Sequence, residues 1–585
     1  MQLLWTDTLF ASLPLLVLLT SPAHSDIFTS SEKLQLLPVR EEALLTSLDK
    51  YLETRTDKPT YLTSFLAERT AALKTFQQQN NTFHPNAAFH NIRLFVANWG
   101  YVLQSYPDFN ATLGELGTGL PDYEDYVGAL GAIVRLQRIY SLHVRDVCAG
   151  NYSGHTGPPL QAWHAADVGL QAYKNGHTQT SIEWLEYALS QLTDTDQQEN
   201  AQAKAHVLTT LANAYRQTNQ GSKAQELYLE CKKLAPQAPD VIQLEKDLKN
   251  TTFSNPVTNA LNESAHEGPT LWDQFTDCCR RDKFHTVSAL RPHHVCQYKP
   301  GFSVPSYVTF KVEILSLVPA ASLIYDVIYD EEIQVLVDFA KENLGTARIG
   351  NDNARVDLKS RTSQLSWVHD DQSPVVRGLS QRVKVMTGLE VEQRFPKGPS
   401  SAESFQVLNY GMGNMLQVLN YGMGGHYNPH YDTYARDVRP LSTHLQPAGN
   451  RIATVLFYLS DVEKGGSTVF PRAGISVAPR KGAALVWYNF EPDYNDVHNL
   501  TLHAGCPVVI GHKWIANKWI LTYGNTFRRP CGPSPNTTQL ELEAIVTSPT
   551  RTKLVTSCVT DDVTLVMIAL SVLFVGGNVR ASTLL

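Results

Sequence analysis

The sequence HYNPHYDTYARD, residues 426–437, decides the fold of the C-terminal half of this chain. In an extended strand the side chains at positions i and i+2 point to the same face, so His430 and Asp432 lie together. With a second histidine, His503, they make a set of two imidazoles and one carboxylate. Such a facial triad holds Fe(II) and leaves three coordination positions open. The residues therefore predict a non-heme iron site.

The second informative stretch is LHAGCPVVIGHKW, residues 502–514. Lys513, ten residues after His503, supplies a cation for the far carboxylate of an iron-bound oxoacid. Two other histidines compete with His503 as the ligand. His512 directly precedes Lys513, so its side chain faces the other way in a strand, and His498 lies in a polar stretch expected to be a loop. We therefore expect His503 to be the ligand.

Short β-rich runs alternate with Gly, Pro and Asn turns around both stretches, which predicts an antiparallel β domain. The runs are Ile452–Leu459, Ala483–Tyr488 and Val508–Ile510. Upstream, IYDVIYDEEIQVLVDFAKENL (324–344) predicts a strand followed by a helix.

The octapeptide QVLNYGMG occurs twice, at 406–413 and at 417–424. A repeat of eleven residues reverses the facing of a strand because eleven is odd, so both copies cannot occupy one strand position. We expect the second copy, which leads directly to His430, to be the functional one. The first is then a looped-out insertion or an error in the gene model.

The N-terminal third is predicted to be helical, because apolar residues recur at helical spacing. These residues are Leu44, Leu45, Leu48, Leu52, Leu62, Phe65, Leu66 and Leu73. Further on, the spacing of one tetratricopeptide unit is found at Leu211, Ala212, Tyr215, Ala224, Tyr228 and Pro236. The segment AYKNGHTQTSIEWLEYAL (172–189) is expected to form the preceding helix pair. Paired helices of this type form a concave groove, and aromatic side chains in a groove suit a polyproline II ligand.

The chain of 585 residues has a net charge of −7, and no basic block suggests a nucleic-acid partner. The apolar run Leu9–Leu19 and the small residues up to Ser25 predict a secretory signal over 1–25, although Asp7 stands where a positive charge is usual. A short buried helix is the alternative. Sequons for N-glycosylation, which fit a luminal protein, occur at Asn80, Asn110, Asn151, Asn250, Asn262, Asn499 and Asn536.

The C-terminal tail contains the apolar run Val563–Val575, which is shorter than the ~20 residues of a spanning helix. A polar spacer precedes the run, so a lipid-anchor signal is one interpretation of it. A weak tail anchor or an incidental sequence are the others. We therefore do not expect membrane attachment through this run, and the lipid anchor and the weak tail anchor are the alternatives.

Four segments resemble the catalytic domain of the collagen prolyl 4-hydroxylase α subunits. They are QVLNYGMGGHYNPHYD (417–432), GNRIATVLFYLSDVEKGGSTVFP (449–471), KGAALVWYN (481–489) and HAGCPVVIGHKWIANKWI (503–520), the last followed by FRRPC. The match runs from roughly residue 305 to Cys531, and weaker similarity extends back to about residue 30.

The resemblance implies an α+β multidomain protein. Its expected parts are a helical dimerisation region (26–150), a TPR-like domain that binds proline-rich peptide (151–250), a linker with one disulfide (251–304), a double-stranded β-helix or jelly-roll dioxygenase domain (305–535) and a tail (536–585). The implied cofactors are Fe(II), 2-oxoglutarate, O2 and L-ascorbate.

The resemblance also assigns roles to single residues. Fe(II) would bind His430, Asp432 and His503, 2-oxoglutarate would bind Lys513 and Tyr421, and the peptide channel would be lined by Tyr427, Arg451 and Trp519. Tyr427 and Trp519 could instead pack in the core, and Arg451 could form a structural ion pair.

In the TPR-like domain, the resemblance places Tyr173 and Trp184 in the peptide groove, unless they are core residues between helices. Asn213 occupies a position that is tyrosine in relatives, so the grip on substrate could differ. The implied disulfides are Cys279–Cys296 and Cys506–Cys531, with Cys278 a possible replacement for Cys279.

The implied activity is hydroxylation of peptidyl proline at C4 in X-Pro-Gly repeats of procollagen, in the lumen of the endoplasmic reticulum. Protein disulfide isomerase is the implied partner in an α2β2 tetramer. Lysyl hydroxylases, a rival family, read the oxoacid with arginine, so Lys513 argues against them. Relatives carry a histidine where this chain has Leu521. That departure keeps open two alternatives, a hydroxylase with altered substrate and a non-catalytic subunit that binds proline-rich chains.

Overall fold

The computed structural model describes residues 27–538 with interruptions at 80–82, 193–200, 252, 254–268, 282–295, 303–306, 347, 350–354, 357–360, 392–414, 434–448, 494–495, 523–524, 526–527, 530–531 and 533–536. The predicted signal, the first copy of QVLNYGMG and the run Val563–Val575 lie outside the described residues. Among the helices within them, none combines the length and the apolar character that crossing a membrane requires.

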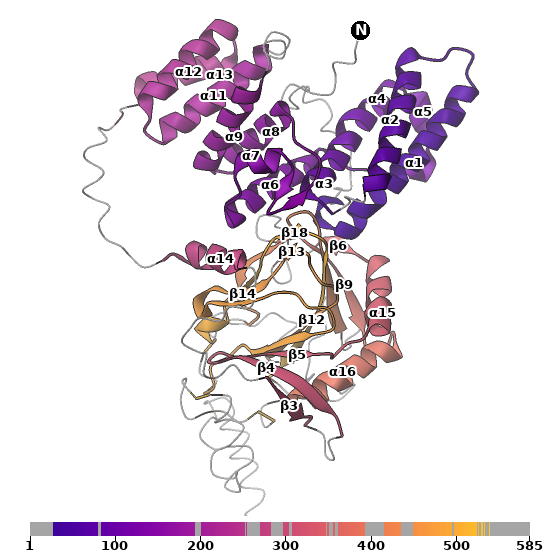
Figure 1. Cartoon of the computed structure of the whole chain (residues 1–585), viewed down its shortest axis with the longest axis vertical. Helices are drawn as coiled ribbons and strands as arrows, with labels where there is room; N and C mark the ends of the chain where they lie inside the picture. Colours follow the sequence, from indigo (N-terminus) through magenta and orange to yellow (C-terminus); the bar gives the residue numbers. More distant parts are fainter. Residues whose placement is uncertain are drawn as a thin grey trace, which may run out of the picture.

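The N-terminal region is helical, as its periodicity predicts (Figure 1). Its elements are η3 (Ile27–Thr29), α1 (Ser31–Glu53), α2 (Thr60–Gln79), α3 (Pro85–Arg93), η4 (Leu94–Trp99), α4 (Gly100–Ser105), α5 (Pro107–Thr112), η5 (Gly114–Gly117), α6 (Tyr123–Tyr140) and α7 (Val144–Cys148). Ser30 caps α1 by accepting from the Lys33 amide. Leu44, Leu48 and Leu52 are buried along one side of α1, as expected of core positions.

A second helical group follows the short hairpin β1 (Asn151–Tyr152) and β2 (His155–Thr156). It consists of α8 (Ala162–Lys174), α9 (Thr178–Gln191), α11 (Ala201–Gln217), α12 (Gly221–Leu234) and α13 (Pro239–Asn250). Helix α8 packs on α9, and α11 packs on α12. Leu211, Tyr215, Ala224 and Tyr228 are buried between these helices.

Antiparallel strands form the C-terminal half, as the short β-rich runs predict. The larger sheet has the order β3-β4-β5-β16-β12-β19-β10-β9-β6. Its strands are β3 (Cys296–Pro300), β4 (Thr309–Leu317), β5 (Ala320–Tyr325), β6 (Gly345–Thr346), β9 (Gln364–His369), β10 (Met415–Tyr421), β12 (Arg451–Tyr458), β16 (Ala484–Tyr488) and β19 (Lys513–Leu521).

A smaller sheet with the order β11-β17-β14-β15 faces the larger one. Its strands are β11 (Tyr427–His430), β17 (His503–Gly505), β14 (Thr468–Phe470) and β15 (Ile475–Val477); β13 (Lys464–Gly465) pairs with β18 (Val508–Ile510), and β7 (Arg348–Ile349) pairs with β8 (Arg355–Val356). One apolar cluster contains Phe470 and Val477 from the smaller sheet and Leu456 and Ile515 from the larger. The two sheets therefore share a core between their inner faces.

Helices α15 (Asp330–Lys341) and α16 (Pro374–Thr387) cover the opposite face of the larger sheet (Figure 1). Leu336 and Leu379 from these helices join Val455 and Ala516 of the sheet in a second apolar cluster. Strand β12 is consequently buried along its whole length, on both faces. The strand and helix predicted over 324–344 correspond to the end of β5 and to α15.

The segment 251–304, expected to be a linker, contains helix α14 (Leu271–Arg280). Its start is a capping box in which Thr270 and Asp273 exchange hydrogen bonds, a local signal that the low periodicity of the segment masks. Helix α14 packs against α6 and β14, and Arg280 donates from Nε to the Ile139 carbonyl oxygen at 2.7 Å.

Both predicted disulfides are wrong. Cys279, on α14, is bonded to Cys506, with the two Cα atoms 5.6 Å apart. The physical reason is the packing of α14 beside the end of β17, whereas Cys296 lies exposed on the edge strand β3 and is free. Cys278 is buried and free, and Cys531 lies outside the described residues.

Candidate metal centre and cosubstrate pocket

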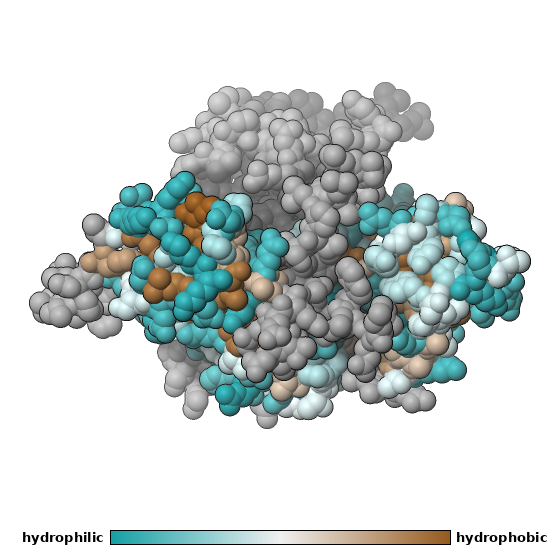
Figure 2. Space-filling view, turned by 90° about the horizontal axis from the view of Figure 1, so that it is seen from above, coloured by the Kyte–Doolittle hydropathy of each residue, from teal (hydrophilic) through white to brown (hydrophobic). Residues whose placement is uncertain are grey.

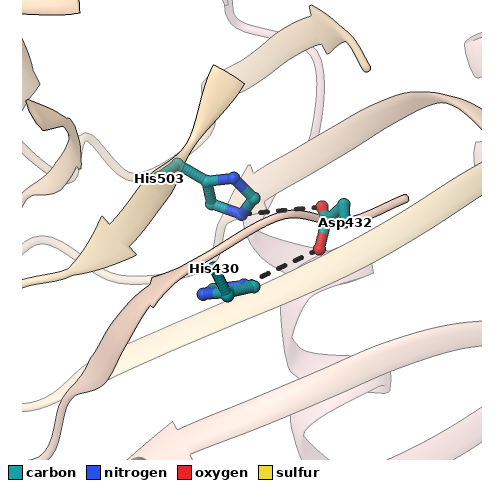
Figure 3. A group of neighbouring side chains, drawn as sticks. All are labelled: His430, Asp432 and His503. Atoms are coloured by element: carbon teal, nitrogen blue, oxygen red, sulfur yellow. Dashed lines mark ion pairs between the residues drawn. The ribbon is translucent and has the colours of Figure 1, made fainter. Parts of the chain in front are cut away.

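The structure brings the three predicted metal ligands together. His430 ends β11, Asp432 follows two residues later, and His503 begins β17, which pairs with β11 so that the two histidines lie opposite each other. Figure 3 shows the three side chains pointing toward one another, and one ligand atom from each lies within 4.8 Å of the others. The Asp432 carboxylate faces both rings, with its oxygens 3.7 Å from Nε2 of His430 and 3.7 Å from Nε2 of His503.

The backbone fixes which ring nitrogen of each histidine is free. Nδ1 of His430 lies 2.8 Å from the Asn428 carbonyl oxygen, and Nδ1 of His503 lies 3.0 Å from the Thr501 carbonyl oxygen. A carbonyl oxygen only accepts, so a neutral ring must hold its proton on Nδ1. Both Nε2 lone pairs are then free to bind an ion on the Asp432 side, the arrangement that metal-binding histidines adopt.

Burial and neighbouring charges set the protonation states of His430 and Asp432. Burial lowers the pKa of His430 to about 3, and His503 beside it adds to this shift, so the ring is neutral at physiological pH. Burial acts to raise the pKa of the Asp432 carboxyl, but His503, His430 and Arg451 together hold this pKa below its ordinary value. The neutral His430 imidazole, the His503 imidazole and one carboxylate therefore face one point, a donor set that fits a divalent iron ion.

Two residues on β12 hold Asp432, Thr454 at its carboxylate and Arg451 at its backbone. Thr454 donates from Oγ1 to Asp432 Oδ2 at 2.8 Å, and Arg451 donates from Nη1 to the Asp432 carbonyl oxygen at 3.3 Å. Thr454 is fully buried and was not singled out from the sequence. Only its position three residues after Arg451 on a predicted strand could have pointed to it, because its partner Asp432 lies beyond the end of β11, far away in the sequence. Asn489 donates from Nδ2 to Thr454 Oγ1 at 3.2 Å and extends this chain of hydrogen bonds.

Lys513 and Tyr421 lie side by side on the larger sheet, as the first and last residues of their paired strands. Nζ of Lys513 lies 5.1 Å from the centre of the Tyr421 ring. A Cβ atom built on Gly505 would lie 3.9 Å from Nζ, which places the ammonium beside the strand that His503 begins. Lys513 is 1% exposed, and burial lowers its pKa to about 7. An anionic group beside it would restore its charge.

The predicted channel residues surround the triad. The Tyr427 ring stacks on that of His430 with the centroids 3.6 Å apart, and the Arg451 guanidinium lies 4.0 Å from the centre of the Trp519 ring. Tyr427 is partly exposed, whereas Arg451 and Trp519 are buried. Arg361, which the sequence reasoning missed, is buried with its guanidinium 4.5 Å from the centre of the Tyr427 ring.

The two rival histidines, His498 and His512, lie outside the triad. His498 accepts from the Leu500 amide at 3.3 Å and so caps the short helix η8 (Asn499–Thr501). The His512 ring lies 4.9 Å from the ring of Phe83 in the N-terminal region. Leu521, at the end of β19, is fully buried and pairs with Arg451 across the sheet. Strand alternation puts Leu521 on the same face as Lys513 and Trp519.

The two aromatic residues predicted to line the peptide groove, Tyr173 and Trp184, differ in their exposure. Trp184 is fully buried within the core of the helical region, so its placement in a peptide groove is wrong, and the alternative of a core residue holds. Tyr173 is partly exposed, and its hydroxyl accepts from Nε2 of Gln217 at 2.8 Å. Asn213 is also partly exposed, and its Oδ1 accepts from Nε of Arg216 at 3.2 Å.

Comparison with known proteins matches both halves of the chain. Residues 30–154 match the family described as the N-terminal region of the prolyl 4-hydroxylase alpha-subunit, and residues 416–521 match the 2OG-Fe(II) oxygenase superfamily. Prolyl 4-hydroxylase subunit alpha-1 of Homo sapiens is 32% identical over 548 residues, which cover 87% of this chain and 96% of the relative. Subunit alpha-3 of Homo sapiens is 30% identical over 524 residues, with coverage of 85% and 89%.

Among solved structures, a viral collagen prolyl hydroxylase from Paramecium Bursaria Chlorella virus-1 in complex with 2OG is similar at 25% sequence identity. The alignment covers 34% of this chain and 95% of the viral chain, with a TM-score of 0.26.

Proposed function

This chain belongs to the prolyl 4-hydroxylase α subunits, and from that premise we propose that it hydroxylates peptidyl proline at C4 in X-Pro-Gly repeats of procollagen-type chains. The reaction consumes O2 and 2-oxoglutarate, places one oxygen atom on proline and the other in succinate, and releases CO2. The single observation that supports it most is the convergence of His430, Asp432 and His503, with the buried side chain of Lys513 beside the strand that His503 begins.

Fe(II) would bind Nε2 of His430 and of His503 and the Asp432 carboxylate. The bound iron supplies the redox chemistry that oxygen activation requires. The chain itself fixes both tautomers through backbone carbonyl oxygens and holds the carboxylate with Thr454. One carboxylate leaves part of the charge of a divalent ion uncompensated, which favours an anionic cosubstrate.

Lys513 and Tyr421 would hold the 2-oxoglutarate carboxylate that is remote from the metal. In a site from which water is excluded, a buried ammonium forms a strong charge-assisted hydrogen bond with a carboxylate. Burial raises the pKa of Tyr421 to about 12, so its hydroxyl keeps a proton to donate. Arg451 and Trp519 would shape the peptide channel beside Asp432, and Tyr427 would cover His430. The two facing sheets would then form a double-stranded β-helix around this site.

The second helical group would be the TPR-like peptide-binding domain. Figure 2 shows hydrophobic residues among hydrophilic ones on the arm that holds α11–α13, where Leu229, Ile242 and Phe253 are exposed. Together with the partly exposed Tyr173, such side chains offer apolar surface to a polyproline II chain. The arm would therefore hold proline-rich chains outside the metal centre.

The cellular setting rests on family membership and on sequence signals. We propose an endoplasmic-reticulum location, a cleaved signal over 1–25, L-ascorbate as the reductant that maintains Fe(II), and an α2β2 tetramer with protein disulfide isomerase. Dimerisation would use the N-terminal helices. The sequon residues Asn110 and Asn250 are exposed, which is what glycosylation needs.

The test is conversion of 2-oxoglutarate to succinate by the full chain, co-expressed with protein disulfide isomerase and given a (Pro-Pro-Gly)n peptide. We expect succinate and 4-hydroxyproline in equal amounts, and the loss of both in His430→Ala. His206→Ala is the matched control, because His206 also contacts a carboxylate, that of Asp240, but lies on α11. Peptide binding without either product would instead establish the non-catalytic subunit, which Leu521 in place of the histidine of relatives favours.

A further inference from the structure

The first described residues of the chain lie against the turn that follows β10. We call Ile27–Ser31 the strap and Gly422–Gly425 the β10 turn. The Gly422 amide donates to the Thr29 carbonyl oxygen at 3.0 Å, and the Met423 amide donates to the Phe28 carbonyl oxygen at 3.2 Å. Strand β10 pairs with β19 up to Tyr421, its last residue. The next two residues form backbone hydrogen bonds with the strap instead.

A side chain of β10 completes this contact. Asn420 is fully buried, and its Oδ1 accepts from Ser30 Oγ at 2.7 Å and from the Glu32 amide at 3.2 Å. Its Nδ2 donates to Ser31 Oγ at 2.9 Å. The Glu32 amide belongs to the first turn of α1, where amides lack a partner within the helix. Asn420 therefore acts as a cap for α1 supplied from the catalytic half of the chain.

The approach is too close for any side chain at Gly422. A Cβ atom there would lie 2.3 Å from the Phe28 carbonyl oxygen, which real structures do not tolerate. On its other side the strap is held by α6, because the Phe28 amide donates to Asp125 Oδ1 at 3.1 Å and the Phe28 ring lies directly against Gly128. Arg135 of α6 also donates from Nε to the Gly424 carbonyl oxygen at 2.9 Å. The turn is therefore clamped from two directions.

Tyr421 lies between the two contact points, Asn420 and Gly422, and its ring faces Lys513. We propose that the strap is a positioning element for 2-oxoglutarate, which fixes the end of β10 so that Tyr421 and Lys513 present one preformed carboxylate site. A preformed site binds more tightly because less ordering is needed on binding. This inference rests on the proposed function of Lys513 and Tyr421, and it makes Asn420, Ser30 and Ser31 positioning residues.

The test compares Asn420→Ala, the milder Ser31→Ala and Asn420→Asp in the full chain. The probe is 2-oxoglutarate binding measured by calorimetry, with Mn(II) in place of iron. We expect Asn420→Ala to raise the Kd about tenfold, the effect of losing a buried hydrogen-bonded group. We expect a smaller rise for Ser31→Ala and little change for Asn420→Asp, which keeps an acceptor at the start of α1. In turnover, the KM for 2-oxoglutarate should rise while kcat and the KM for peptide change less than about twofold.

Arg69→Ala is the matched control, since it breaks the ion pair from α2 to Glu41 of α1 without touching the strap. It should lower stability but leave the Kd unchanged. Because coupling is reciprocal, 2-oxoglutarate should also slow amide exchange in the strap. An unchanged Kd in Asn420→Ala, or equal losses in kcat and in both KM values, would overturn the inference. Lys513→Ala distinguishes failure of the strap inference from failure of the proposed cosubstrate site. If Lys513→Ala also leaves the Kd for 2-oxoglutarate unchanged, the proposed function of Lys513 fails.

Discussion

At the residue scale, Lys513 links the proposed cosubstrate to pH. Burial lowers its pKa to about 7, and a bound carboxylate must raise that pKa again because it favours the charged form. Above pH 7 the free enzyme loses the proton that the complex needs. We therefore expect the Kd for 2-oxoglutarate to rise by about tenfold per pH unit from pH 7 up to the pKa of the complex, measured by calorimetry with Mn(II) at the metal site.

Lys513→Met is the control for this titration, because it removes the ammonium but keeps an unbranched side chain. The Lys513→Met variant should bind 2-oxoglutarate weakly, and its Kd should not change over the same pH range. A Kd for the unmodified chain that stays constant from pH 7 to 9 would show that another group holds the cosubstrate.

Leu521 is a second residue whose role can be tested singly. It is fully buried on the face of β19 that carries Lys513 and Trp519, so a polar side chain there would meet the site directly. Leu521→His should raise kcat/KM about tenfold, the value of one hydrogen bond to a charged group. Leu521→Met, which fills similar space without a donor, should not change kcat/KM. If the histidine lowers turnover while the fold is retained, this site is adapted to leucine.

At the scale of elements, the disulfide fixes α14 to the strand that carries His503. Cys279 and Cys506 are 227 positions apart in the sequence, so the bond constrains a long loop in the unfolded chain. Cys279→Ser should lower the free energy of unfolding by about 2–5 kcal/mol, measured by denaturant titration. Cys278→Ser, a buried free thiol in the same helix, should cost less.

Peptide mapping without reduction tests the pairing itself. It should recover a fragment that joins Cys279 to Cys506, and recovery of Cys279 joined to Cys296 would contradict the structure. Such a pairing could not be deduced from the sequence, because eight cysteines allow many combinations. The sequence does not show that α14 packs on β14, and it is this packing that brings Cys279 to the end of β17.

At the scale of the whole molecule, the features that depend on residues close together in the sequence could be predicted. The features that depend on contacts between distant segments could not. The helices around Leu44 and the strand after Arg451 were predicted from local periodicity, and the pair His430 and Asp432 from strand alternation. Thr454 and Asn420 were not, because each gains its role from a partner on a distant element. The resemblance placed Trp184 in the peptide groove, whereas its side chain is fully buried in the helical core, and burial is a property that an aligned position does not carry.

The two-part architecture gives a last prediction, which concerns peptide length. Helices α8–α13 and the metal centre could bind the same substrate peptide at once. A long peptide would then bind more tightly, because once one part is bound the other part is held at a high effective concentration near its site, whereas a short peptide cannot reach both sites. Tyr173→Ala should therefore raise the KM for long (Pro-Pro-Gly)n peptides about tenfold and leave the KM for short ones and kcat unchanged. The measurement is KM against peptide length. Tyr101→Ala, an exposed tyrosine on α4, is the control. Parallel curves for the Tyr173 variant and the unmodified chain would mean that the arm does not hold the substrate during turnover.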